Sequence, residues 1–334
     1  MDRRRFLRNA AGMGGALLSA PLLEAAERGA ATGPSARVAF VKTTDRAAGV
    51  ARALDLLGLR GFQGRNLFIK PNFNSADTFP GSTHNDTLVA LIRKLQNLGA
   101  GPLTVGDRSG MGDTRGVMES KGIFKLGAEV GAKVVVLDEL PGQHWEKIEQ
   151  PGFHWQRGFA IPQIVRSAGG VVTTCCLKTH RFGGHFTLSL KNSVGLAAKH
   201  VPTDPYNYMH ELHSSPHQRR MIAEINSAYA PELVVLDGVQ AFSGGGPEAG
   251  TLVNTNVILA GTDRIAIDAV GVAILRSVGT TPEVSRGPIF QLEQIARAAE
   301  LGIGVKSPGQ IELVTGDPQS AEYAGRIREF LTGS

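Results

Sequence analysis

Cysteine is nearly absent from this 334-residue chain, because only Cys175 and Cys176 occur and they are adjacent. Neighbouring cysteines rarely form a disulfide with each other, since the small ring strains the peptide bond. No C-x-x-C spacing is present, so we expect no iron–sulfur cluster from this chain alone. The apolar residues around the pair favour buried thiols, and a reactive thiol is the alternative.

The chain also lacks a strong charge and a long apolar run. Its formal net charge is +5; residues 1–31 hold five arginines and three acidic residues, so the remainder carries +3. That excess is too small to indicate nucleic-acid binding. No segment after residue 31 reaches the roughly 18 apolar residues of a membrane-spanning helix.

The first residues, MDRRRFLRNAAGMGGALLSAPLL, resemble a twin-arginine export signal. The pair Arg3-Arg4 precedes a Phe-Leu dipeptide and then a short, glycine-containing apolar run. This pattern predicts a signal peptide over residues 1–31 that the twin-arginine export machinery recognises, with cleavage within residues 20–32. We therefore expect a periplasmic or otherwise exported protein that has no stable transmembrane anchor after cleavage.

Strand-like and helix-like segments alternate after this signal. Residues 37–43 resemble a strand and residues 45–58 a helix that ends at Gly58, and residues 66–72 and 85–99 repeat this order. Further strands are predicted at residues 102–110, 132–139, 169–180, 232–238 and 255–263. Such βαβα order predicts an α/β fold with a mostly parallel sheet flanked by helices.

One interruption divides this pattern. Between residues 141 and 160, polar and apolar residues alternate around Pro151-Gly152, which predicts a small β-hairpin excursion. We expect a single α/β domain over residues 37–331, and the interruption leaves two packed lobes as an alternative arrangement.

Polar clusters follow five of the predicted strands. They are KPN (70–72), GDRSG (106–110), CCLKTH (175–180), LDG (236–238) and GTD (261–263). The carboxyl ends of parallel strands meet at one edge of a sheet, so these clusters predict a single ligand-binding cleft, although each alone is compatible with an ordinary turn. The candidate ligand-binding residues are Lys70, Asn72, Asp107, Ser109, Asn192, Gly245, Gly246 and Asp263.

The densest cluster is CCLKTHRFGGHFTLSLKN, residues 175–192. Lys178, Lys191, His180 and Asn192 would place two cations, an imidazole and an amide around a small anion such as a carboxylate or phosphate. A lysine at the end of a buried strand can also act as a base or form a Schiff base. Surface charges and a turn histidine are the alternative interpretation.

As an enzyme, the chain would use Lys178 and Lys191 to stabilise charge and His180 as a general acid or base. Asp237 or Asp263 would orient a partner or hold a metal. Six of the nine histidines lie between residues 180 and 217, but without the H-E-x-x-H spacing of zinc proteases. We assign no residue as a metal ligand, and the sequence does not indicate which cofactor, if any, the protein binds.

The order of these motifs resembles the domain-of-unknown-function 362 (DUF362) family from about residue 37 to residue 315. The resemblance lies in KPN, HNDTLVALIRKLQNLGA, LTVGDRSG, LKTHRFGGHFTLSLKNSVGL, LDGVQAFSGGGPEAG and ILAGTDRIAIDAVG. It implies the fold and the family without an activity. Many family members carry an additional ferredoxin-like module with cysteine-rich motifs, which this chain lacks.

The function that we expect is an enzyme acting on a small anionic substrate in a cleft lined by lysine, histidine and aspartate. A non-catalytic periplasmic protein that binds a ligand or cofactor is the first alternative. A metal-dependent hydrolase that uses the carboxylates and the histidines of residues 200–217 is the second.

Overall fold

A computed structural model describes residues 36–110 and 112–333. The predicted twin-arginine signal lies outside these residues. The described residues belong to one compact unit. Among the helices of this part, none is both long enough and apolar enough to cross a bilayer.

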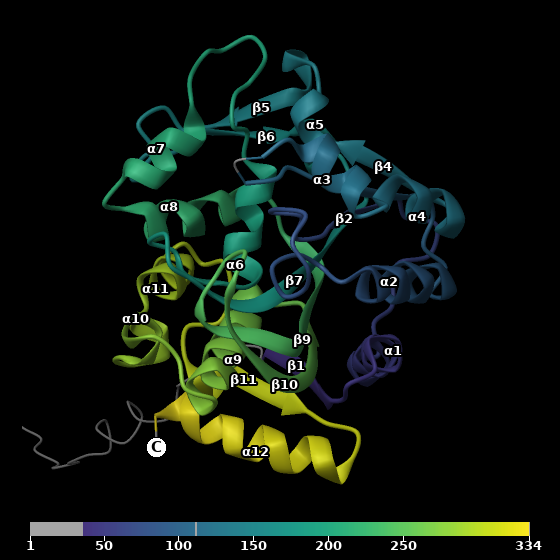
Figure 1. The fold of residues 1–334 in the computed structure, drawn as a ribbon, viewed down its shortest axis with the longest axis vertical. Helices are drawn as coiled ribbons and strands as arrows, with labels where there is room; N and C mark the ends of the chain where they lie inside the picture. Colours follow the sequence, from purple (N-terminus) through teal and green to yellow (C-terminus); the bar gives the residue numbers. More distant parts are fainter. Residues whose placement is uncertain (1–35, 111, 334) are drawn as a thin grey trace, which may run out of the picture. The chain divides into compact units, whose positions relative to one another are not determined.

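Nine strands of the described residues form one sheet (Figure 1). They are β1 (Ala36–Lys42), β2 (Leu67–Lys70), β3 (Leu103–Asp107), β4 (Ala132–Val136), β7 (Gly170–His180), β8 (His185–Thr187), β9 (Pro231–Gly245), β10 (Gly250–Gly261) and β11 (Ile311–Val314). Their order is β11-β1-β10-β9-β7-β2-β3-β4, with β8 paired to β7. Only β1–β10, β10–β9 and β7–β8 are antiparallel pairs, so the predicted mostly parallel sheet is confirmed.

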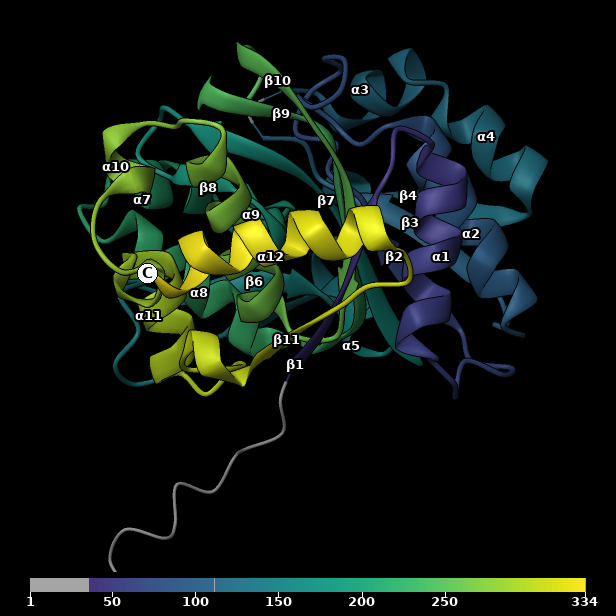
Figure 2. The same cartoon turned by 90° about the horizontal axis from the view of Figure 1, so that it is seen from below.

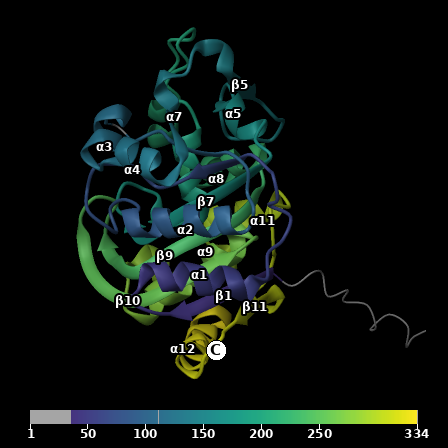
Figure 3. The same cartoon turned by 90° about the vertical axis from the view of Figure 1, so that its right-hand side faces the viewer.

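Helices cover both faces of this sheet (Figure 2). They are α1 (Arg46–Leu57), α2 (Asn85–Asn97), α3 (Thr114–Ser120), α4 (Ile123–Val130), α5 (Gln163–Arg166), α6 (Ser189–Asn192), α7 (Tyr208–Ser214), α8 (Gln218–Ile225), α9 (Arg264–Ser277), α10 (Pro282–Ser285), α11 (Glu293–Glu300) and α12 (Pro318–Thr332). Helices α1 and α2 lie side by side on one face (Figure 3). Their apolar side chains and those of α4 form one core with the sheet, and α9, α11 and α12 form another on the opposite face.

Local signals explain where the helices begin and end. The side chain of Asp45 accepts a hydrogen bond from the backbone N–H of Ala48 and so caps α1, which ends at Gly58 in the left-handed conformation. Residues 114–130 form two helices, α3 and α4, because Gly122 has a φ of 68° between them.

The predicted hairpin near residues 141–160 is also confirmed. Strands β5 (Trp145–Ile148) and β6 (Phe159–Pro162) pair antiparallel in a sheet of their own. Their apolar side chains pack with α7 and α8 in a third core cluster, which includes Trp155 and Met221.

The length of β7 creates the space for a site. All eleven residues of β7 are buried, yet β2 pairs only with residues 170–173 of that strand. The second half of β7 therefore continues beyond the point where β2 ends. Polar residues that follow β2 and β3 can reach this space, and α6 lies over it (Figure 1).

Candidate functional site

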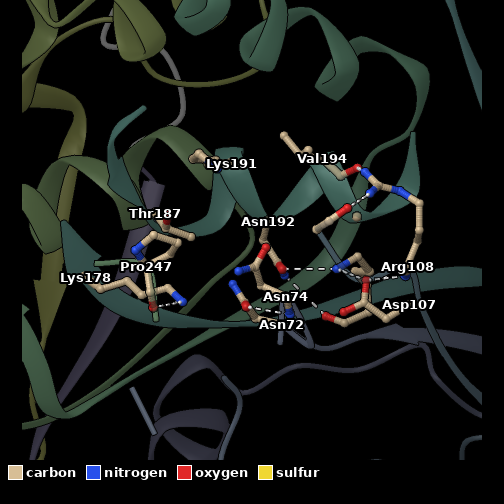
Figure 4. A pocket seen from close by; sticks show the side chains of 13 residues that line it. Asn72, Asn74, Asp107, Arg108, Lys178, Thr187, Lys191, Asn192, Val194 and Pro247 are labelled. Atoms are coloured by element: carbon tan, nitrogen blue, oxygen red, sulfur yellow. Dashed lines mark hydrogen bonds and ion pairs between the residues drawn. The ribbon is translucent and has the colours of Figure 1, made fainter. Parts of the chain in front are cut away.

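A polar cavity of about 40 Å³ lies beyond the carboxyl end of β2 (Figure 4). A buried water needs at least roughly 10–15 Å³ measured in this way, so the cavity holds only a few water-sized groups. Its polar side chains are Lys70, Asn72, Asn74, Asp107, Arg108, Lys178, Thr187, Lys191 and Asn192. The predicted convergence of polar residues after three strands, at 70–72, 106–110 and 175–180, thus produces one cavity.

A buried ion pair forms one end of the cavity. Lys70 and Asp107 are the last residues of two adjacent parallel strands, and Lys70 Nζ lies 2.7 Å from Asp107 Oδ1. The backbone N–H groups of Phe73 and Arg108 also donate to this carboxylate, at 2.6 and 2.7 Å. Burial raises the pKa of Asp107, although Lys70 and these donors oppose the shift. Lys70 further donates to the carbonyl of Pro71 and to Asn192, so each of the three N–H groups of its ammonium has an acceptor.

Arg108 is a residue that the sequence analysis missed. Its guanidinium group is buried and donates to the backbone carbonyls of Ala197, Val194 and Ser109. No carboxylate among the described residues forms an ion pair with it. Arg108 therefore fixes the chain after α6 and adds a positive charge to the cavity. Its position in the polar cluster GDRSG (106–110), next to Asp107, was the signal that could have identified it.

Lys178 and Thr187 face each other across the β7–β8 pair. The Lys178 ammonium group is buried and donates to the carbonyls of Gly81 and Pro247, which leaves one N–H group unused. The hydroxyl of Thr187 is buried and has no hydrogen-bond partner among the described residues. This pair therefore presents two unused polar groups to the cavity, at the end away from Asp107 (Figure 4).

Lys191 lies at the same end of the cavity, on α6 (Figure 4). Its half-buried side chain makes no hydrogen bond or ion pair with any described residue. Burial lowers the pKa of Lys191 to about 7, and the positive charges of Lys178 and Arg108 act in the same direction. The helix that carries it is held in place because Asp268 accepts the backbone N–H groups of Ser189 and Leu190.

His180 lies next to Lys191 but does not line the cavity. A side chain at Gly184 would place its Cβ 2.6 Å from Lys191 Cε and 2.9 Å from His180 Nδ1, so both side chains lie against this glycine. His180 Nδ1 is buried and has no partner among the described residues. Burial and the charges of Lys191 and Lys178 lower the pKa of His180, which keeps the imidazole neutral.

The family model for a domain of unknown function, DUF362, matches residues 67–273. The chain belongs to the DUF362 family. A thylakoid-associated protein of Synechocystis sp. is 27% identical over 254 residues, which cover 74% of each protein. A crystal structure of a Thermotoga maritima protein from a structural genomics consortium has 10% sequence identity and a TM-score of 0.45. That match covers 70% of the present chain, which spans 56% of the Thermotoga chain.

Several residues predicted for the site lie elsewhere in this DUF362 protein. Asp237 is an interior residue of β9 and forms an ion pair with Arg46, with 2.8 Å between Oδ2 and Nε. Asp263 caps α9 and accepts the backbone N–H of Val305. Ser109 donates to the carbonyl of Phe73. These three side chains support the fold around the cavity and do not line it.

Gly245 and Gly246, two of the predicted ligand-binding residues, shape a turn next to the cavity. Gly245 and Gly246 have φ values of 80° and 68°, in the left-handed region that favours glycine. A Cβ on Gly246 would collide with the carbonyl of Thr179, so no other residue fits there without a shift. The turn brings the carbonyl of Pro247 onto Lys178.

The histidines and carboxylates considered as metal ligands do not lie together in the structure. Within residues 36–110 and 112–333, no group of three or more His, Cys, Asp or Glu side chains is placed to hold a metal ion. His213 instead bonds the carbonyl of Met209, and His217 packs against His154. Cys175 and Cys176 are free thiols and buried, and burial raises the pKa of Cys176 to about 11. A reactive thiol finds no support in this environment.

Proposed function

We propose that this DUF362 protein is an enzyme that binds a small substrate with a carboxylate or phosphate group in the cavity. Four cationic side chains line it, and the single carboxylate among its lining residues, Asp107, is paired with Lys70. Arg108, Lys178 and Lys191 therefore lack a carboxylate partner. A bound anion would supply the missing negative charge. It would also accept hydrogen bonds from the unused N–H group of Lys178 and from the hydroxyl of Thr187.

The observation that favours catalysis is the amine of Lys191. A binding protein needs a cation that holds the anion. Burial lowers the pKa of Lys178, whose ammonium group is held by the carbonyls of Gly81 and Pro247. Lys191 has no hydrogen-bond or ion-pair partner within residues 36–110 and 112–333, and its pKa of about 7 lets it gain or lose a proton near neutral pH. General acid–base catalysis works best when the pKa of the catalytic group lies near the working pH. We assign anion binding to Lys178 and Thr187, and proton transfer to Lys191.

Calorimetric titration with oxalate and with phosphate tests the binding step. Lys178→Met should weaken the affinity roughly 10- to 100-fold, because a hydrogen bond to a charged group contributes about 1.5–3 kcal/mol. The matched control is Lys133→Met, at an exposed position of β4. Equal affinity of the wild type and Lys178→Met for both anions would overturn this assignment.

A non-catalytic binding protein is the second candidate, and the full occupation of Lys70 and Arg108 favours it. Such fixed side chains form a rigid, preorganised pocket that needs no chemistry to hold an anion. Lys191→Arg separates the two candidates once a substrate is known. The arginine keeps a positive charge but stays protonated, so an enzyme should lose turnover while binding persists.

We also propose that residues 1–31 direct export through the twin-arginine machinery. The support is the Arg3-Arg4 pair with its short apolar run, which is typical of such signals. An exported protein would meet its small anionic ligand in the periplasm.

A further inference from the structure

The three lysines of the cavity differ in how many acceptors they already have. Lys70 donates to three groups, namely Asp107, Asn192 and the carbonyl of Pro71. Lys178 donates to two carbonyls. Lys191 donates to none among the described residues. Lys191 is therefore the one amine of the cavity that can react without breaking an existing hydrogen bond.

The surroundings of Lys191 favour its neutral, nucleophilic form. Two cationic side chains, Lys178 and Arg108, line the same cavity, and the ion pair of Lys70 with Asp107 lies at the other end (Figure 4). Loss of a proton from Lys191 relieves repulsion between like charges and lowers the cost of burial. A lysine placed among other cations in a desolvated site is a recognised way to obtain a reactive amine.

Lys178 and Thr187, which can hold a carboxylate, line the same cavity as Lys191 (Figure 4). The unused N–H group of Lys178 and the unpartnered hydroxyl of Thr187 come from directly opposed residues of β7 and β8. The cavity of about 40 Å³ is small and Lys191 also lines it, so the carbon next to a carboxylate held by these two groups would lie toward Lys191. A carbonyl at that carbon would face the amine.

We propose that Lys191 forms an imine with the carbonyl carbon of a small 2-oxo acid whose carboxylate is held by Lys178 and Thr187. This inference rests on the proposed anion binding and names the substrate class. The neutral amine adds to the carbonyl carbon, a C–N bond forms, and the carbonyl oxygen leaves as water. Both hydrogens of that water derive, in net terms, from the amine nitrogen, so the step needs no oxidant, reductant or second substrate.

Reductive trapping with pyruvate and cyanoborohydride tests the proposal. The hydride reduces an imine to a stable secondary amine, which intact-protein mass spectrometry detects and peptide mapping locates. We expect the reduced pyruvate adduct on Lys191 in the wild type and in the surface control Lys133→Met. Lys191→Arg should show no adduct at this position. Lys178→Met should form the adduct at least tenfold more slowly, and acetone, which lacks the carboxylate, should label Lys191 poorly in every variant.

Oxalate titration of the same samples separates two kinds of failure. If oxalate binds in a manner that depends on Lys178 but pyruvate gives no adduct on Lys191, the imine is wrong and the anion site stands. If neither oxalate nor pyruvate binds, the anion site itself is wrong. Adducts spread over surface lysines, with equal yield in Lys191→Arg, would also overturn the imine.

Discussion

Lys70 and Asp107 end two neighbouring parallel strands and form an ion pair in which each side chain is only 1% exposed. Removal of two charges from water costs several kcal/mol per ion, so this pair depends on its additional hydrogen bonds. Those bonds come from the backbone at Phe73 and extend to Asn192, which lies on α6. The ion pair thus connects the strand ends to the helix that carries Lys191.

We expect Lys70→Met to destabilise the protein strongly, because it leaves the Asp107 carboxylate buried without its cation. Removal of one partner of a buried pair typically costs about 3–5 kcal/mol. The double variant Lys70→Met/Asp107→Leu should lose less than the sum of the two single variants. Guanidinium unfolding of the four proteins measures this coupling. An additive result would show that the pair contributes no coupling energy.

An exposed ion pair provides the control for this measurement. Arg115 and Glu139 lie on the surface, each with 47% of its side chain exposed. Solvent screens such pairs, so Arg115→Met should change the unfolding free energy far less than Lys70→Met. Equal losses in the two variants would mean that burial does not govern the cost.

The second prediction concerns Gly184, which lies against the side chains of Lys191 and His180. In Gly184→Ala the new methyl group would come within 3 Å of Lys191 Cε and His180 Nδ1, and it would displace the flexible lysine. We expect at least a tenfold loss of pyruvate trapping on Lys191 with a smaller change in stability. Gly325→Ala in α12, where a Cβ meets no atom within 4 Å, should leave trapping unchanged. Undiminished trapping in Gly184→Ala would remove this glycine from the site.

The sequence predicted the cavity where polar residues follow parallel strands, at Lys70 and Asp107. The same argument did not locate Asp263. That residue follows β10, which runs antiparallel to β9 and β1, so its carboxyl end lies at the opposite edge of the sheet. The predicted strand 232–238 continues as β9 to Gly245, which leaves Asp237 inside a strand and next to Arg46. Strand direction and strand length depend on tertiary pairing, which a local pattern does not contain.

The sequence also did not indicate in which direction the side chains at the end of a strand point. Residues 106–110 were expected to line a cleft through Asp107 and Ser109, yet Arg108 turns into the cavity, where it donates to four backbone carbonyls. Those carbonyls belong to residues 109, 110, 194 and 197, and two of them are more than 80 residues away in sequence. Period-2 alternation applies within strands and ends where the strand ends.

The third prediction concerns export. Replacement of Arg3 and Arg4 by lysine should remove the protein from the exported fraction and leave it inside the cell, because the export machinery reads the paired arginines. Immunoblots of periplasmic and cytoplasmic fractions measure this distribution. Arg28→Lys, in the same N-terminal segment, is the matched control and should be exported normally. Export of the double lysine variant at the wild-type level would contradict the predicted signal.

The last prediction follows from the protonation of Lys191. The folded-state pKa of this lysine is lowered from 10.5 to about 7. Below pH 7 both the folded and the unfolded chain hold its proton, and between about pH 7 and pH 10.5 only the unfolded chain does. The contribution of Lys191 to the unfolding free energy therefore becomes more favourable to the folded state as the pH rises across this window. The difference in unfolding free energy between the wild type and Lys191→Met should increase in the same direction.

Anion binding should show the opposite dependence on pH. Lys178 and Thr187 hold one carboxylate of oxalate, and a protonated Lys191 would attract the second. The wild type should therefore bind oxalate more weakly as the pH rises through about 7, whereas Lys191→Met should change little. At pH 8 the bound anion should draw a proton onto Lys191. Titrations in buffers of different ionisation enthalpy would reveal this proton uptake, which Lys191→Met should lack. Identical pH profiles in the two proteins would mean that the charge of Lys191 does not act on the bound anion.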